Sequence, residues 1–163
     1  MSSLRLKRRI IDAVCEMVET ELSVVMRAAQ SAHHAATHEE AKPENDKDTR
    51  SVEAAYLAGA QASRAAELQH MISRLRTMEL AEFDEQTPLG AGAIVELEEN
   101  GAIHRYLLLP VGGGMKLQID GVPVSTISVS SPLGSVLCGT QVGDDVELDT
   151  PRGVRELHVH YAA

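Results

Sequence analysis

The chain has 163 residues, 44% of them hydrophobic and 24% charged, a composition typical of a globular protein with one or two domains. Only 2% of the residues are aromatic, too few to line a ring-rich ligand pocket or a base-stacking surface. The net charge of −9 argues against direct binding to DNA, because an acidic surface repels phosphates.

The negative charge is concentrated in the second half of the chain. Residues 1–80 carry a net charge of −1, whereas residues 81–163 carry −8. This difference indicates two parts of unlike character, and it does not exclude a basic protein as the partner of the second part.

The cysteines and the N-terminus predict an ordinary cytoplasmic protein. Cys15 and Cys138 lie far apart and show no metal-binding spacing, so we expect reduced thiols. The basic N-terminus is followed by acidic residues instead of an apolar run of about 18 residues, which argues against a signal peptide or a membrane span. We therefore expect no contact with membranes.

The first half of the chain predicts two long helices. From Leu4 to about His38 there is no Gly or Pro, and apolar residues recur every seven positions, as in a helix that packs against another helix. A second stretch, from Thr49 to about Met78, repeats leucines and methionines in the same way. A helix of about 35 residues is about 50 Å long and needs a partner. We expect residues 1–80 to form an antiparallel coiled-coil hairpin.

The apolar residues of the two expected helices differ in size along the hairpin. Alanines are concentrated at the joined ends of both helices, whereas the free ends carry the larger Leu, Ile, Val and Met. Small side chains let two backbones approach closely, but they bury less apolar area. We therefore expect a hairpin that is narrow towards its tip and better packed at its base.

The segment that joins the helices, residues 39–50, forms an acidic tip. It contains five acidic residues within ten positions, alternating with two lysines. Pro43 ends the first helix, and Asp48 or Thr49 can cap the second. Two interpretations of the tip stay open. It is either a solvated turn, or Glu44 and Asp46 supply hard oxygen ligands to a Mg²⁺ ion in another molecule.

Beyond Met78 the apolar pattern changes from a period of seven to a period of two, which predicts strands. Asn-Gly at 100–101 and Asp-Gly at 120–121 mark turns, and Ser131-Pro132 marks the start of a short helix. We therefore expect an α+β protein in which residues 84–163 form a small, mainly antiparallel sheet with one short helix. Its expected strands are 94–98, 102–109, 115–119, 122–129, 146–148 and 154–161.

Several other patterns are interpreted without a catalytic role. His34 and His38 have the i, i+4 spacing of two metal ligands, but no third ligand lies at a defined spacing. His158 and His160 share one face of the last strand and are expected to be exposed. The Gly112–Gly114 stretch lacks the Lys-Ser/Thr of a phosphate loop and is interpreted as a flexible loop. No serine lies in a G-x-S-x-G motif.

Residues 126–153, TISVSSPLGSVLCGTQVGDDVELDTPRG, resemble the C-terminal domain of the Gre transcript cleavage factors, which bind bacterial RNA polymerase. The shared features are I-S-V-x-S-P-[IL], a following L-x-G, V-G-D-x-V-E and T-P-x-G. With the expected hairpin, the resemblance covers nearly the whole chain. It implies an FKBP-like domain that binds the polymerase rim through Ser131, Pro132 and Leu133, and a coiled coil inserted through the secondary channel.

The resemblance also implies a role for the tip. In the family, two tip acids near a Glu-Asn dipeptide hold the second catalytic Mg²⁺ of the polymerase, which then cleaves backtracked RNA. Glu44 matches one of these acids by its asparagine neighbour. The family's aspartate three residues earlier is Ala41 here, so Glu40, Asp46 or Asp48 would have to replace it.

Two actions on the polymerase stay open: stimulation of transcript cleavage, and modulation or inhibition without cleavage. In both, the factor is a monomer with no enzymatic activity and no cofactor of its own. It meets the Mg²⁺ ion and the RNA 3′ end only inside the polymerase. Less favoured hypotheses are prolyl isomerisation, for which the chain offers few aromatic residues, and an adaptor that pairs through its coiled coil.

Overall fold

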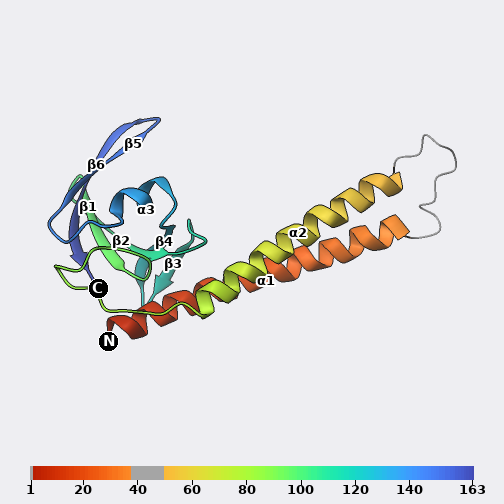
Figure 1. Cartoon of the computed structure of the whole chain (residues 1–163), viewed down its shortest axis with the longest axis horizontal. Coiled ribbons are helices and arrows are strands. Elements are labelled where there is room, and N and C mark those ends of the chain that lie inside the picture. The colour runs from red at the N-terminus through yellow and green to blue at the C-terminus, as the bar shows by residue number, and fades with distance from the viewer. Residues whose placement is uncertain (1, 38–49) are drawn as a thin grey trace. The chain divides into compact units, whose positions relative to one another are not determined.

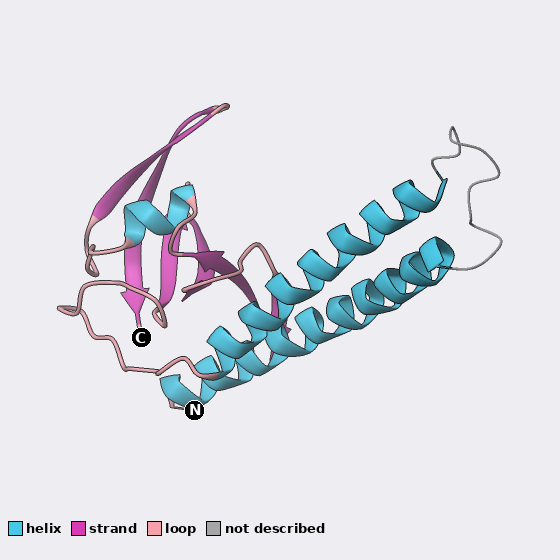
Figure 2. Ribbon diagram, turned by 45° about the vertical axis from the view of Figure 1, so that its right-hand side comes forward, coloured by secondary structure: helices cyan, strands magenta, loops and turns pink. Residues whose placement is uncertain are grey.

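The computed structural model describes residues 2–37 and 50–163 (Figures 1 and 2). Helices α1 (Ser3–Thr37) and α2 (Arg50–Arg76) come first, and a six-stranded sheet with one short helix follows. The predicted α+β class is confirmed. The chain divides into two compact units, Met1–Val14 with Arg74–Ala163, and Cys15–Ser73. Within the described part of the chain, neither long helix has the continuous apolar stretch that crossing a membrane requires.

In the helical unit, residues 15–73, the two helices run antiparallel, as the heptad pattern predicts (Figure 2). Val18 and Leu68, at the end of the unit away from the tip, are each 1% exposed. Closer to the tip the apolar side chains of α2 face solvent, with Val52 66% and Tyr56 82% exposed. Burial of apolar area therefore decreases along the hairpin, as the distribution of alanines predicts.

We predict that this decrease in burial appears as a decrease in amide protection along α1. Amides between residues 11 and 18 should exchange at least about tenfold more slowly than those between 24 and 31, because opening the outer turns exposes less apolar surface. Hydrogen exchange followed by mass spectrometry measures the difference. Equal protection from Ile11 to Ala35 would contradict the argument.

The sheet has the strand order β3-β4-β2-β1-β6-β5. Neighbouring strands are antiparallel except β2 and β4, which run parallel because the chain first passes through β3 at the outer edge. Each predicted strand is present, and β5 is longer than predicted because its register with β6 extends to both ends. The elements are β1 (Ile94–Glu99), β2 (Ala102–Leu109), β3 (Lys116–Ile119), β4 (Val122–Ser128), α3 (Pro132–Leu137), β5 (Asp145–Thr150) and β6 (Gly153–Ala162).

Two of the hairpin turns have the backbone that their sequences predict. Asn100 and Gly101 have φ angles of 51° and 80°, and Asp120 and Gly121 have 54° and 78°. Two successive left-handed residues suit the right-handed twist of the flanking strands, and Asn, Asp and Gly adopt this region most readily. The turns therefore set the registers of β1 with β2 and of β3 with β4.

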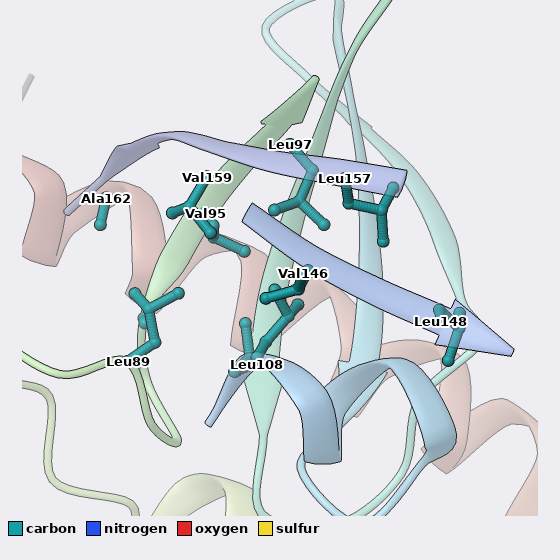
Figure 3. Packing of buried hydrophobic residues seen from close by; sticks show 11 residues of the cluster. Leu89, Val95, Leu97, Leu108, Val146, Leu148, Leu157, Val159 and Ala162 are labelled. Atoms are coloured by element: carbon teal, nitrogen blue, oxygen red, sulfur yellow. The ribbon is translucent and has the colours of Figure 1, made fainter. Parts of the chain in front are cut away.

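The core of the sheet unit lies between one face of the sheet and α3 (Figure 3). Leu137 of α3 is fully buried there, and Phe83 and Tyr106 pack at its margin. The buried cluster consists of aliphatic side chains from the strands, α3 and the loops beside them: Leu89, Ala93, Val95, Leu97, Leu108, Leu137, Val146, Leu148, Leu157, Val159 and Ala162. Alternate residues of β1 and β6 supply four of these, as expected of side chains that share one face of a sheet.

The first turns of α1 belong to the same compact unit as the sheet. Ile10, Ile11 and Val14 are completely buried. Arg9 forms a bidentate ion pair with Asp120 in the β3–β4 turn, and its Nη2 lies 2.9 Å from Oδ1 of Asp120. The predicted domain ranges, residues 1–80 and 84–163, stay a prediction, and residues 1–14 are grouped with the sheet in one compact unit.

Candidate functional site

The predicted tip acids lie outside the described residues. Glu40, Glu44, Asp46 and Asp48 all fall between the end of α1 at Thr37 and the start of α2 at Arg50. Their role as Mg²⁺ ligands therefore stays a prediction from residue type and resemblance. Within the described residues, no group of three or more His, Cys, Asp or Glu side chains could hold a metal ion.

The predicted partner-binding residues lie at the start of α3. Ser131 is the N-cap, with φ −71° and ψ 160°, and Pro132 is the first helical residue. The Ser131 Oγ accepts a hydrogen bond from the Gly134 N–H at 3.0 Å and donates one to the Ser128 carbonyl at 2.7 Å. The hydroxyl therefore satisfies a free N–H at the helix start and also ties the helix to the end of β4.

The turn before α3 depends on two glycines. A Cβ at Gly134 would lie 2.0 Å from the Ser128 carbonyl oxygen, and a Cβ at Gly113 would lie 2.6 Å from the Ser128 nitrogen. Neither distance leaves room for any other residue without a backbone shift. The Gly112–Gly114 stretch, interpreted from sequence as a flexible loop, is instead packed against β4, and the Gly114 N–H donates to the Thr126 carbonyl at 2.7 Å.

The three predicted contact residues differ in what they offer a partner. Pro132 is exposed, whereas Leu133 is half-buried and packs against the core. Ser131 is half-buried and uses its hydroxyl within the turn. Two neighbouring serines are exposed: Ser130 Oγ lies 2.8 Å from Ser128 Oγ, and Ser135 Oγ donates to the Pro132 carbonyl at 2.9 Å. The turn is held by hydrogen bonds within the chain and has Pro132 at its surface.

Charge on the sheet is divided between paired and unpaired carboxylates. Glu99 is bound by both Nε and Nη2 of Arg155, each at 2.7 Å, and this hydrogen bonding lowers the pKa of Glu99. Asp145 Oδ1 lies 2.7 Å from His158 Nδ1. Among the described residues Glu98, Glu147 and Glu156 have no ion pair, and they line a shallow depression on the sheet together with Asp145 and His158.

The histidines are placed partly as predicted. His33 and His34 are exposed on α1, and His38 lies outside the described residues. His160 is exposed, but His158 is half-buried beside Asp145. Sequence reasoning missed this pair and the two glycines around Ser128, because the partners are separated in sequence by 13 residues or, for Gly113, by 15.

We predict that the turn is sensitive to single methyl groups. Gly134→Ala should lower the free energy of unfolding by about 3 kcal/mol or more, because the added Cβ overlaps the Ser128 carbonyl. Ser131→Ala should lower it by about 1 kcal/mol through loss of the cap. Urea unfolding of the full chain measures both. The matched control is Ser135→Ala, whose exposed hydroxyl should matter by less than about 0.5 kcal/mol.

Comparison with known proteins agrees with the geometry of the sheet unit. Residues 89–161 match the family model described as transcription elongation factor GreA/GreB, C-terminal. The chain is 36% identical over 70 residues to the transcription elongation factor GreA of Syntrophobacter fumaroxidans, a match that covers 43% of this chain and 41% of that protein. It is 39% identical over 71 residues to the transcription inhibitor protein Gfh1 of Thermus thermophilus, covering 44% of each.

These matches span less than half of the length of the curated relatives. A crystal structure of Gfh1 from Thermus thermophilus aligns with 91% of this chain and 94% of that chain, at 24% identity and a TM-score of 0.37. The motif around Ser131 and the sequence matches carry the assignment: residues 89–161 of this chain are a domain of the GreA/GreB C-terminal type.

Proposed function

We propose that the protein binds bacterial RNA polymerase, with the sheet unit on the polymerase rim and the helical hairpin inserted through the secondary channel. The observation that carries the proposal is the rigid Ser131-Pro132 turn within the stretch that matches the GreA/GreB C-terminal model. A turn that is already ordered loses little conformational entropy when it binds, which favours a stable contact. The net charge of −8 on residues 81–163 suits a basic surface on the partner.

The hairpin is proposed to act through its acidic tip. The polymerase would do the chemistry, and the tip would add carboxylate oxygens to a Mg²⁺ ion that the polymerase alone holds weakly. Glu44 is the proposed first ligand and Asp46 the second, with Glu40 and Asp48 as the alternatives. In this proposal the protein is an accessory factor, and the polymerase is the enzyme.

Inhibition without cleavage is the second candidate action. Ala41 stands where the family has an aspartate, and one of the similar proteins is named a transcription inhibitor. Another similar protein is named an elongation factor, at nearly the same identity. The matched region lies in the sheet unit and does not include the tip. Assays on the polymerase are therefore needed to distinguish stimulation of cleavage from inhibition.

We predict that Pro132→Ala weakens binding to core RNA polymerase by about tenfold, which corresponds to about 1.4 kcal/mol. Pro132 is exposed and needs no partner within the chain, so the free energy of unfolding should change little. Binding measured by biolayer interferometry should also weaken as salt is raised. Ser135→Ala, one turn further along α3, is the matched control. Equal affinity of Pro132→Ala and wild type would remove the turn from the interface.

We predict that Glu44→Ala combined with Asp46→Ala abolishes any effect on transcript cleavage while binding to polymerase survives. A carboxylate in a solvated turn contributes little to folding, so stability should change by less than about 0.5 kcal/mol. Higher Mg²⁺ should partly restore the single variants, because added metal compensates for a lost ligand. Cleavage in stalled elongation complexes is the measurement, and Glu39→Ala is the matched control.

Wild-type protein separates the two candidate actions in the same assay. Binding with slower nucleotide addition and no cleavage would establish inhibition and remove the tip acids from a cleavage role. A wild-type protein that neither binds polymerase nor changes any elongation rate would overturn the whole proposal.

A further inference from the structure

A lysine is completely buried in the unit that contains the sheet. Lys7, on the second turn of α1, is 0% exposed, although lysine is almost never fully buried without a charged partner. Its Nζ donates a hydrogen bond to the Ala81 carbonyl at 2.6 Å and lies 4.7 Å from the centre of the Phe83 ring. Ala81 and Phe83 belong to residues 77–83, called here the connecting segment, which leads from α2 towards the sheet.

The interactions of the Lys7 amine with the protein replace only part of the hydration that it loses on burial. Lys7 forms no ion pair with any described residue. Glu82, on the connecting segment, is the charged neighbour whose field favours the protonated amine, and Arg9, on its own helix, is engaged by Asp120. A carbonyl and an aromatic face replace only part of the hydration of an ammonium group. Burial therefore lowers the pKa of Lys7 from 10.5 to about 8.

The connecting segment is also packed on its other side. A Cβ added to Gly92, which has a φ of 94°, would lie 3.1 Å from Met78 Cε and 3.9 Å from Phe83 Cε2. The Phe83 ring therefore lies close both to the buried amine and to the backbone at Gly92, just before β1. A change at Lys7 must alter how this ring is held, because the amine and the ring are in direct contact.

We propose that Lys7, Ala81 and Phe83 form a proton-sensitive clamp, which holds the connecting segment against α1 most firmly when the amine has lost its proton. In the closed form the amine is buried, and in an open form it is solvated with an ordinary pKa. Between pH 8 and 10.5, approximately the two pKa values, closing releases a proton, so the closed form gains stability as the pH rises. Below about pH 8 the amine is protonated in both forms and the effect levels off.

A single fluorine probe tests the clamp in the full-length protein. Phe83 is the only phenylalanine in the chain, so labelling with 4-fluorophenylalanine gives one ¹⁹F resonance from the ring that touches Lys7. We expect this resonance to titrate with a midpoint near pH 8. We also expect the ratio of open to closed forms, measured by ¹⁹F saturation transfer, to fall about 27-fold from pH 7 to pH 9.5.

Variants of Lys7 assign the titration to this residue. Lys7→Met keeps an unbranched side chain without a titrating group, so the step near pH 8 should disappear and the segment should stay closed. Lys7→Arg keeps its charge at every pH tested, so the open form should increase without any pH dependence. Arg8→Met, at the exposed neighbouring position, should leave the wild-type step unchanged.

Three results would overturn the proposal. The first is a wild-type resonance with no step between pH 7 and pH 9.5. The second is an unchanged step in Lys7→Met, which would assign the titration to another group. The third is a step near pH 8 with no accompanying change in the open population, which would show that the proton is not coupled to release of the segment.

Discussion

The close approach of two glycines to the backbone of Ser128 is the constraint on which the Ser131-Pro132 turn depends. Side chains at Gly113 and Gly134 would collide with the Ser128 nitrogen and carbonyl oxygen, so β4 and α3 can meet only where both residues lack a Cβ. The same carbonyl accepts hydrogen bonds from both the backbone N–H and the hydroxyl of Ser131. The Ser128 carbonyl thus holds together the end of β4, the turn and the start of α3. Pro132 owes its position to this arrangement, and a surface ordered in advance binds at a lower entropic cost.

The acidic charge of the sheet unit is not spread evenly. Glu99 is held by Arg155, whereas Glu147 lies directly opposite Glu156 in the β5–β6 register. Like charges in facing positions destabilise a strand pair. On an edge strand such as β5 they also discourage pairing with other chains, which gives the acids a role in the free protein. The remaining negative charge would attract a basic partner and would make that attraction sensitive to salt.

Local stability is expected to be lowest in two places, the outer turns of the helical hairpin and the surroundings of the buried lysine. The outer turns of the hairpin expose Val52 and Tyr56, so this part of the hairpin buries less apolar area. Two long helices packed on each other expose more surface per residue than a compact bundle, and the proposed insertion into the polymerase channel would account for their length. Lys7, near the start of α1, is buried without an ion pair to any described residue and donates a hydrogen bond to the connecting segment. Both features lower the local stability of the segments concerned. In the proposed function the hairpin responds to a partner, and in the proposed clamp the connecting segment responds to protons.

The sequence by itself determined the helices, the strands and the helix start at Ser131. Heptad periodicity, Asn-Gly and Asp-Gly turns and the Ser-Pro dipeptide each act over a few neighbouring residues, and each predicted its element correctly. The resemblance in residues 126–153 pointed to the family whose C-terminal model matches residues 89–161. The tip acids stay predictions from residue type and resemblance, because they lie outside the described residues. Only the tertiary structure decided that Lys7, one of several basic residues near the N-terminus, is buried under Phe83, and that Gly113 and Gly134 enclose Ser128. These contacts join segments that folding brings together. The burial of a side chain and the close approach of two backbone segments leave no pattern in the neighbouring sequence, so they could not be predicted from it.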